Sequence, residues 1–146
     1  MASKSILLLF LMLITSPAAF SSGNGSIIVE ISGFSESKGN AIVYLYSESA
    51  EDAYPTKSEK SMSMKKSAVK NKKCRIIFKD IPYGDYAIAV HHDENSNDEV
   101  DTNFIGIPTE DMGASNNAKG SFGPPSFEDA KFSFRSKEKT LKINMD

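Results

Sequence analysis

The sequence predicts a single all-β domain, a β-sandwich of about six or seven strands with one long irregular loop at 93–128. Two observations lead to this fold class. Short segments rich in β-branched and aromatic residues recur along the chain and are separated by turn residues, and no segment shows the apolar periodicity of a strong amphipathic helix. The length of 146 residues suits one domain.

The first 22 residues have the order of a secretory signal. Lys4 precedes an apolar run at 6–14, and small residues follow at 16–22. The run is too short for a hydrocarbon core that needs about 20 residues. We therefore expect a signal peptide at 1–22 and a sandwich domain at 23–146, exported to the periplasm or the extracellular space, with no transmembrane segment after cleavage.

The segments 26–31 and 41–46 are the first predicted strands. The Gly39-Asn40 pair between them is a turn signal, so the two strands are expected to form an opening hairpin. The stretch 47–72 is polar, rich in lysine and either weakly helical or irregular. A charge run of this kind is typical of a solvated face, and a docking patch for an acidic partner is the alternative.

Strands are also predicted at 74–78, 85–92, 131–135 and 140–145, with a tight turn at 80–84. In the segment 85–92, large apolar residues alternate with small ones, which favours a central strand packed on both faces. The only cysteine, Cys74, lies in a predicted strand and is interpreted as a small buried hydrophobe. A net charge of −2 gives no basic surplus for nucleic acid or an anionic membrane.

The segment after the histidine pair is acidic and follows the predicted strand 85–92 directly. Calcium prefers six to eight hard oxygen ligands, and Asp or Asn at alternate positions of a curved loop supplies them. One hypothesis is therefore a Ca²⁺ site formed by Asp93, Asn95, Asn97 and Asp101, with Glu110 as a more distant candidate.

The alternative is that these residues are turn formers whose side chains bond their own backbone. Asp98 stands where the calcium-loop pattern prefers glycine, and Phe104 stands where it requires a bidentate Glu. The adjacent His91 and His92 should point to opposite faces of their strand. We expect structural or hydrogen-bonding histidines here, because no third nitrogen or sulfur ligand for zinc or copper is available. The alternative is a zinc or copper ion held by His92 with Asp93 or by His91 with Glu94.

Apolar residues within 93–128 are expected to pin the loop to the sandwich; these are Phe104, Ile105, Ile107, Phe122 and Phe127. No nucleophile, base and orienting residue can be named together, so the protein is not expected to be an enzyme. A hydrolase built on the carboxylates of Glu110, Asp111, Glu128 and Asp129 is the weakest of the alternatives.

The stretch 81–132 reads IPYGDYAIAVHHDENSNDEVDTNFIGIPTEDMGASNNAKGSFGPPSFEDAKF. It resembles the DUF2141 family of exported bacterial proteins, and the resemblance extends more loosely over 26–145. The family has no known function. The resemblance implies a transthyretin-like, carboxypeptidase-regulatory-like or Ig-like sandwich. The acidic loop is also similar to the cation-binding loops of B-type repeats in bacterial surface adhesins.

Together these observations predict an exported, non-enzymatic binding or accessory protein whose loop is rigidified by Ca²⁺. The alternative is a cation-independent interaction module of the cell envelope that recognises a protein or a polysaccharide. At 111–114 the chain has Asp-Met-Gly-Ala where relatives often carry aromatic residues, so part of an aromatic ligand surface would be lost here.

Overall fold

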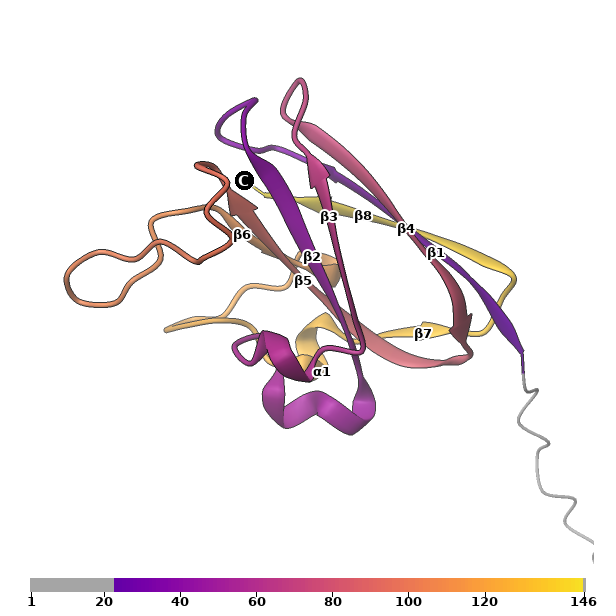
Figure 1. The fold of residues 1–146 in the computed structure, drawn as a ribbon. Helices are drawn as coiled ribbons and strands as arrows, with labels where there is room; N and C mark the ends of the chain where they lie inside the picture. Colours follow the sequence, from indigo (N-terminus) through magenta and orange to yellow (C-terminus); the bar gives the residue numbers. More distant parts are fainter. Residues whose placement is uncertain (1–22, 146) are drawn as a thin grey trace, which may run out of the picture.

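The computed structural model describes residues 23–145 as two β-sheets packed face to face (Figure 1). The predicted export signal at 1–22 lies outside the described residues. The strands are β1 (Asn24–Ser32), β2 (Asn40–Ser47), β3 (Ser63–Ala68), β4 (Lys73–Pro82), β5 (Gly84–Asp93), β6 (Met112–Ala114), β7 (Phe132–Phe134) and β8 (Glu138–Asn144). The helices are short: η1 (Glu48–Ala53), η2 (Ser58–Lys60), η3 (Ser115–Asn117) and α1 (Phe127–Ala130).

One sheet has the strand order β4-β1-β8, and the other has the order β3-β2-β5-β6 with β7 also paired to β5. Strands β1 and β8 run parallel, whereas the other pairs are antiparallel. The inner faces enclose one apolar core that includes Ile27, Val29, Leu45, Ile88 and Phe134. The predicted all-β sandwich is therefore confirmed. Within 23–145, no helix has the length and apolar character to cross a membrane.

The predicted opening hairpin is wrong, because β1 and β2 belong to different sheets. Strand β1 pairs with β4 and β8, and the connection at 33–39 crosses to the other sheet before β2 begins. Strands β4 and β5 are likewise in different sheets, joined at Tyr83. Packed sheets lie only about 10 Å apart, so a short connection can join strands of different sheets as easily as neighbouring strands of one sheet.

Strand β5 is buried on both faces, as its sequence predicts. Its inward side chains join the central core, and Ala87 and Ala89 face a second apolar cluster on the outer side of the five-stranded sheet. Tyr46, Tyr54 and Phe127 supply the large side chains of that second cluster, and η1 and α1 cover this part of the sheet. Cys74 is buried, in agreement with its interpretation as a hydrophobe.

Strand β3 and the 3-10 helices η1 and η2 occupy the stretch that was expected to be helical or irregular. Most side chains of β3 are exposed, and the strand pairs only with β2, at the edge of its sheet. Its lysines are exposed on a solvated face, which agrees with the interpretation of the charge run. An exposed edge strand lacks apolar alternation, and the sequence pattern therefore did not reveal it.

Candidate functional site

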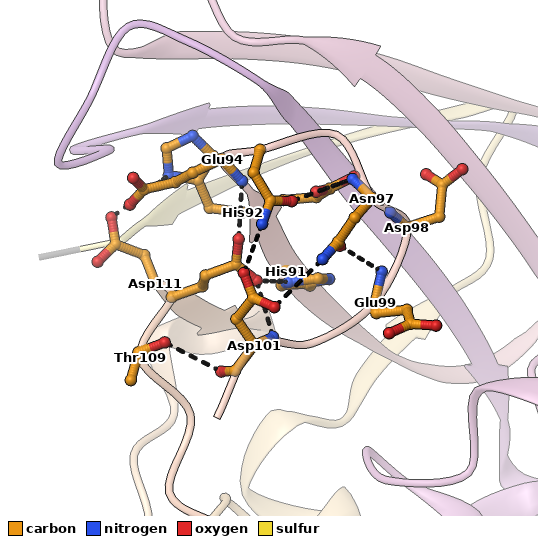
Figure 2. A network of polar contacts seen from close by, with 12 residues as sticks. His91, His92, Glu94, Asn97, Asp98, Glu99, Asp101, Thr109 and Asp111 are labelled. Carbon is orange, nitrogen blue, oxygen red and sulfur yellow. Dashed lines mark hydrogen bonds and ion pairs between the residues drawn. The ribbon is translucent and has the colours of Figure 1, made fainter. Parts of the chain in front are cut away.

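The candidate site lies where β5 ends and the long connection to β6 begins (Figure 2). Strand β5 ends in three fully buried polar residues, His91, His92 and Asp93. The two histidines point to opposite faces as expected: His91 contacts Glu110, whereas the ring of His92 packs edge-on against Phe34 with centroids 4.8 Å apart. Buried polar groups at the end of a central strand require partners, and the connection supplies most of them.

Glu110 fixes both ends of the connection to β5. Its Oε1 accepts from the Glu94 amide at 2.9 Å, and its Oε2 accepts from the Asp101 amide at 3.1 Å and from His91 Nε2 at 2.7 Å. Burial by itself raises the pKa of the Glu110 carboxyl, but these hydrogen bonds outweigh it and hold the pKa below its usual value. Glu110 is thus an ionised, fully bonded anchor.

Asp93 organises the turn that follows β5. Its two carboxylate oxygens accept from the amides of Asn97 and Asp98, at 3.0 and 3.1 Å. Asn95 Oδ1 also accepts from the Asn97 amide. Asp98 adopts a positive φ of 64°, the conformation that glycine usually supplies at this position of a calcium loop. The side chains therefore make the local turns that the cation-free alternative predicts.

Three of the five predicted calcium ligands converge on one another. The side-chain amides of Asn95 and Asn97 donate to Asp101, at 2.6 and 3.2 Å from its two carboxylate oxygens. The carboxylate oxygens of Asp93 and Glu110 instead accept hydrogen bonds from backbone amides and, for Glu110, from His91. A positive charge already lies at the loop, because Lys66 bonds Asp98 and holds the pKa of that carboxyl below its usual range.

The segment 101–109 forms a small hairpin that we call the finger. Thr102 and Pro108 form a β-bridge, and the Thr109 amide donates to the Asp101 carbonyl at 2.9 Å to close the base of the hairpin. At the tip, the Asn103 side chain accepts from the amides of Ile105 and Ile107. The projecting connection after β5 is visible in Figure 1.

The expected apolar anchoring of the connection is wrong for four of the five residues. Phe104 is 98% exposed and Phe122 106%, while Ile105 and Ile107 are 64% and 53% exposed; only Phe127 is buried. The finger is held by polar contacts at its base instead, so its apolar side chains remain free to face solvent. Apolar side chains exposed together at a hairpin tip are typical of an interaction surface.

A second polar group lies on the other side of β5. His92 Nδ1 faces the carboxylates of Asp111 and Glu94, at 3.6 and 3.9 Å. Ser35 binds both acids: its amide donates to Asp111 at 2.8 Å and its hydroxyl to Glu94 at 3.1 Å. Burial raises the pKa of Asp111, but the bonds from Ser35 and the nearby His92 outweigh it, so this pKa is lowered. The sequence signal for this group was the spacing of two residues between His92 and Glu94 at the end of β5, and it was missed.

Gly39 allows the β1–β2 connection to pass close to this end of β5. Its φ is +64°, and a Cβ atom there would lie 2.1 Å from the Asp93 carbonyl oxygen and 2.7 Å from Glu94 Cα. Only glycine fits such an approach without movement of the backbone. The close contact brings Ser35 and Lys38 to the acids that follow β5.

The segment 115–118, Ser-Asn-Asn-Ala, has a structural role. Strand β6 pairs with Ala89–His91 and β7 with Gly84–Tyr86, which leaves a gap in the edge of β5. Ser115 fills it: its buried hydroxyl accepts from the Ile88 amide at 2.9 Å and donates to the Ala130 carbonyl. Asn116 donates to the carbonyls of Asp129 and Lys131. The segment thus completes the sheet.

The four carboxylates of the hydrolase alternative have separate structural partners. Glu128 pairs with Lys131 at 2.7 Å, and Asp129 bonds Ser126 at the start of α1. Glu110 and Asp111 instead bond residues of β5 and the loops beside it. These contacts support structural roles for the four acids.

The protein is a two-sheet β-sandwich in which the buried polar and acidic residues cluster at the end of the central strand β5. Residues 29–142 match a family described as an uncharacterized protein conserved in bacteria, DUF2141, and the chain belongs to this family. Comparison with curated proteins and with solved structures gave no match. The transthyretin-like subtype of the sandwich stays a prediction.

Proposed function

We propose that the protein is an exported, non-catalytic binding module whose finger docks onto an apolar surface of a cell-envelope partner. The observation that carries the proposal is the exposure of Phe104, Ile105 and Ile107 on a hairpin that is closed by the Thr102–Pro108 bridge and joined to Glu110 through the Asp101 amide. The Asn103 side chain already bonds the amides of Ile105 and Ile107, and a loop ordered before binding loses less conformational entropy, which favours affinity. The signal-like segment 1–22 and the bacterial family support export.

A protein partner fits these side chains better than a polysaccharide. Two of the three tip residues are aliphatic, and hydrogen-bonding aromatic side chains such as Tyr are not among them. Apolar anchors at the centre of a contact contribute most of the affinity in protein interfaces. The polysaccharide alternative would require polar groups beside the apolar tip to bond sugar hydroxyls.

The proposal is tested by site-specific photo-crosslinking in a bacterium that exports the protein. A crosslinker at position 104 should capture a discrete partner, and the same probe at the exposed Ser133 of β7 should not. The triple change of Phe104, Ile105 and Ile107 to serine should abolish capture by a probe at Met112, which is also exposed. Equal capture from positions 104 and 133 would contradict the role of the finger.

Calcium binding by the loop is a second candidate function, favoured by the convergence of Asn95, Asn97 and Asp101. Rotation of both amides would turn their oxygens toward the carboxylate, as a hard cation requires. The test is thermal unfolding with Ca²⁺, Mg²⁺ or chelator. At 100 times its dissociation constant, a bound ion adds about 2.7 kcal/mol to the free energy of unfolding. A calcium-specific rise that Asp101→Asn removes would establish this site.

A further inference from the structure

The orientation of the His92 ring leaves one nitrogen without a partner in the interior. Its Nε2 lies 2.9 Å from the carbonyl oxygen of Lys38. A carbonyl only accepts hydrogen bonds, so Nε2 carries a hydrogen and donates. In the neutral ring, Nδ1 then presents a lone pair. This nitrogen is buried and has no hydrogen-bond partner among the described residues.

The lone pair faces two carboxylates at distances that suit a bridging ion. Nδ1 lies 3.6 Å from Asp111 Oδ2 and 3.9 Å from Glu94 Oε1, and the three side chains offer ligand atoms within 4.8 Å of one another. These separations are too long for hydrogen bonds. Around a tetrahedral ion with bonds of about 2.1 Å, neighbouring ligand atoms lie about 3.4 Å apart.

The end of β5 positions His92 and Asp111, and Ser35 positions Glu94. Glu94 is the first residue after β5, and the Ser35 hydroxyl holds its Oε1, which lies 3.9 Å from His92 Nδ1. Asp111 lies across the ladder, because the His92 amide donates to the Asp111 carbonyl at 2.9 Å. A site formed by strand neighbours of this kind is largely preformed.

Outer hydrogen bonds orient every ligand atom. The Lys38 carbonyl fixes the His92 ring, and Ser35 binds Asp111 Oδ2 through its amide and Glu94 Oε1 through its hydroxyl. Metal-binding histidines commonly donate their second ring N–H to a carbonyl, and metal-binding carboxylates are similarly hydrogen-bonded. The arrangement around His92 has both features.

We propose that His92 Nδ1, Glu94 and Asp111 bind a divalent first-row transition ion, with Zn²⁺ as the representative. An imidazole ligand favours such ions over Ca²⁺ and Mg²⁺, which prefer oxygen alone. The acids are partly exposed, at 24% and 29%, so solvent can reach the ion and complete its coordination. The site goes beyond the proposed recognition function and does not depend on it.

The competing occupant is a proton on Nδ1, which would make an ion pair with the acids. Lys38 already balances part of the charge, because its ammonium lies 3.2 Å from the other oxygen of Glu94. The charges of two carboxylates and one divalent ion cancel, and the side chain of Lys38 is 58% exposed, so its charge lies toward solvent. The ion would therefore not leave an uncompensated buried charge.

The chain has only two histidines, which permits a direct test. The protein is expressed from the full chain without a polyhistidine tag, stripped with chelator and titrated with Zn²⁺. Long-range ¹H–¹⁵N spectra report the four ring nitrogens. We expect one equivalent of Zn²⁺ to shift the Nδ1 signal of His92, while the Nδ1 of His91, which faces no comparable acid pair, stays in place.

Variants of the acids avoid disturbing the buried ring. Asp111→Asn and Glu94→Gln should each weaken Zn²⁺ binding at least tenfold, because loss of even an outer partner typically costs 10- to 100-fold. Glu99→Gln removes a nearby exposed charge, and Asp101→Asn alters the calcium candidate; both should bind Zn²⁺ as the parent does. Unchanged affinity in Asp111→Asn, or a shift of neither histidine, would overturn the site. Neither result would affect crosslinking by the finger.

Discussion

Loss of Glu110 is expected to detach the connection between β5 and β6 from the sandwich. In Glu110→Ala, three donors lose their acceptor: the amides of Glu94 and Asp101 and Nε2 of His91. Hydrogen bonds to a charged group contribute about 1.5–3 kcal/mol each, and water can replace part of this at the loop. Breaking a buried charged contact costs about 3–5 kcal/mol, and we expect a loss in that range.

The assay is urea unfolding followed by far-ultraviolet circular dichroism. With a slope of roughly 1–3 kcal/mol per M for a domain of this size, the urea midpoint should fall by about 1–5 M. Glu110→Gln should lose less stability than Glu110→Ala, because the amide keeps one acceptor oxygen. It should still be less stable than the parent, because its N–H groups would face the remaining donors.

Glu128→Gln is the matched control, since its ion pair with Lys131 lies on the surface with 65% of the Glu128 side chain exposed. Exposed pairs of this kind contribute about 0–1 kcal/mol. Equal urea midpoints for Glu110→Ala and Glu128→Gln would show that Glu110 does not anchor the connection.

Three further predictions concern the sheet, the second core and the finger. Ser115→Ala should lower the free energy of unfolding, measured in urea, by about 1–3 kcal/mol, because the buried Ile88 amide loses its acceptor. The control Ser133→Ala, on the exposed face of β7, should change this free energy by less than about 0.5 kcal/mol. Burial raises the pKa of the Tyr54 hydroxyl above its usual value. The contribution of Tyr54 to the free energy of unfolding is therefore fully present below about pH 10 and falls at higher pH, where this tyrosine ionises in the unfolded chain. Tyr54→Phe should reduce this alkaline loss of stability in melting curves recorded at several pH values. Phe104→Ser should leave the melting temperature within about two degrees of the parent, because the side chain is 98% exposed, and a large decrease would show that Phe104 packs on the domain.

The fold class could be predicted because strong local patterns coincide with buried strands. In β5, large and small apolar residues alternate, and the structure buries both faces. The pairing of the strands could not be predicted from such local patterns. The Gly39-Asn40 turn signal is compatible with a hairpin and with a crossover, and only the long-range pairing of β1 with β4 and β8 decides between them.

The candidate site was partly predictable for the same reason. The alternating Asp and Asn residues after β5 are local turn formers, and their hydrogen bonds span five residues or fewer. Glu110 and Asp111 act on β5 from about 19 residues further along the chain, so no sequence period identifies their partners. The apolar tip was misassigned because hydrophobicity alone does not distinguish an anchor from an exposed contact.

Amide hydrogen exchange of the chelator-treated protein is the decisive experiment. We infer that the connection after β5 is ordered by its own side chains. The amides of Glu94, Asn97, Asp98 and Asp101, which all donate to Asp93 or Glu110, should therefore be protected without any metal. Rapid exchange of these four amides that slows only when Ca²⁺ is added would contradict it.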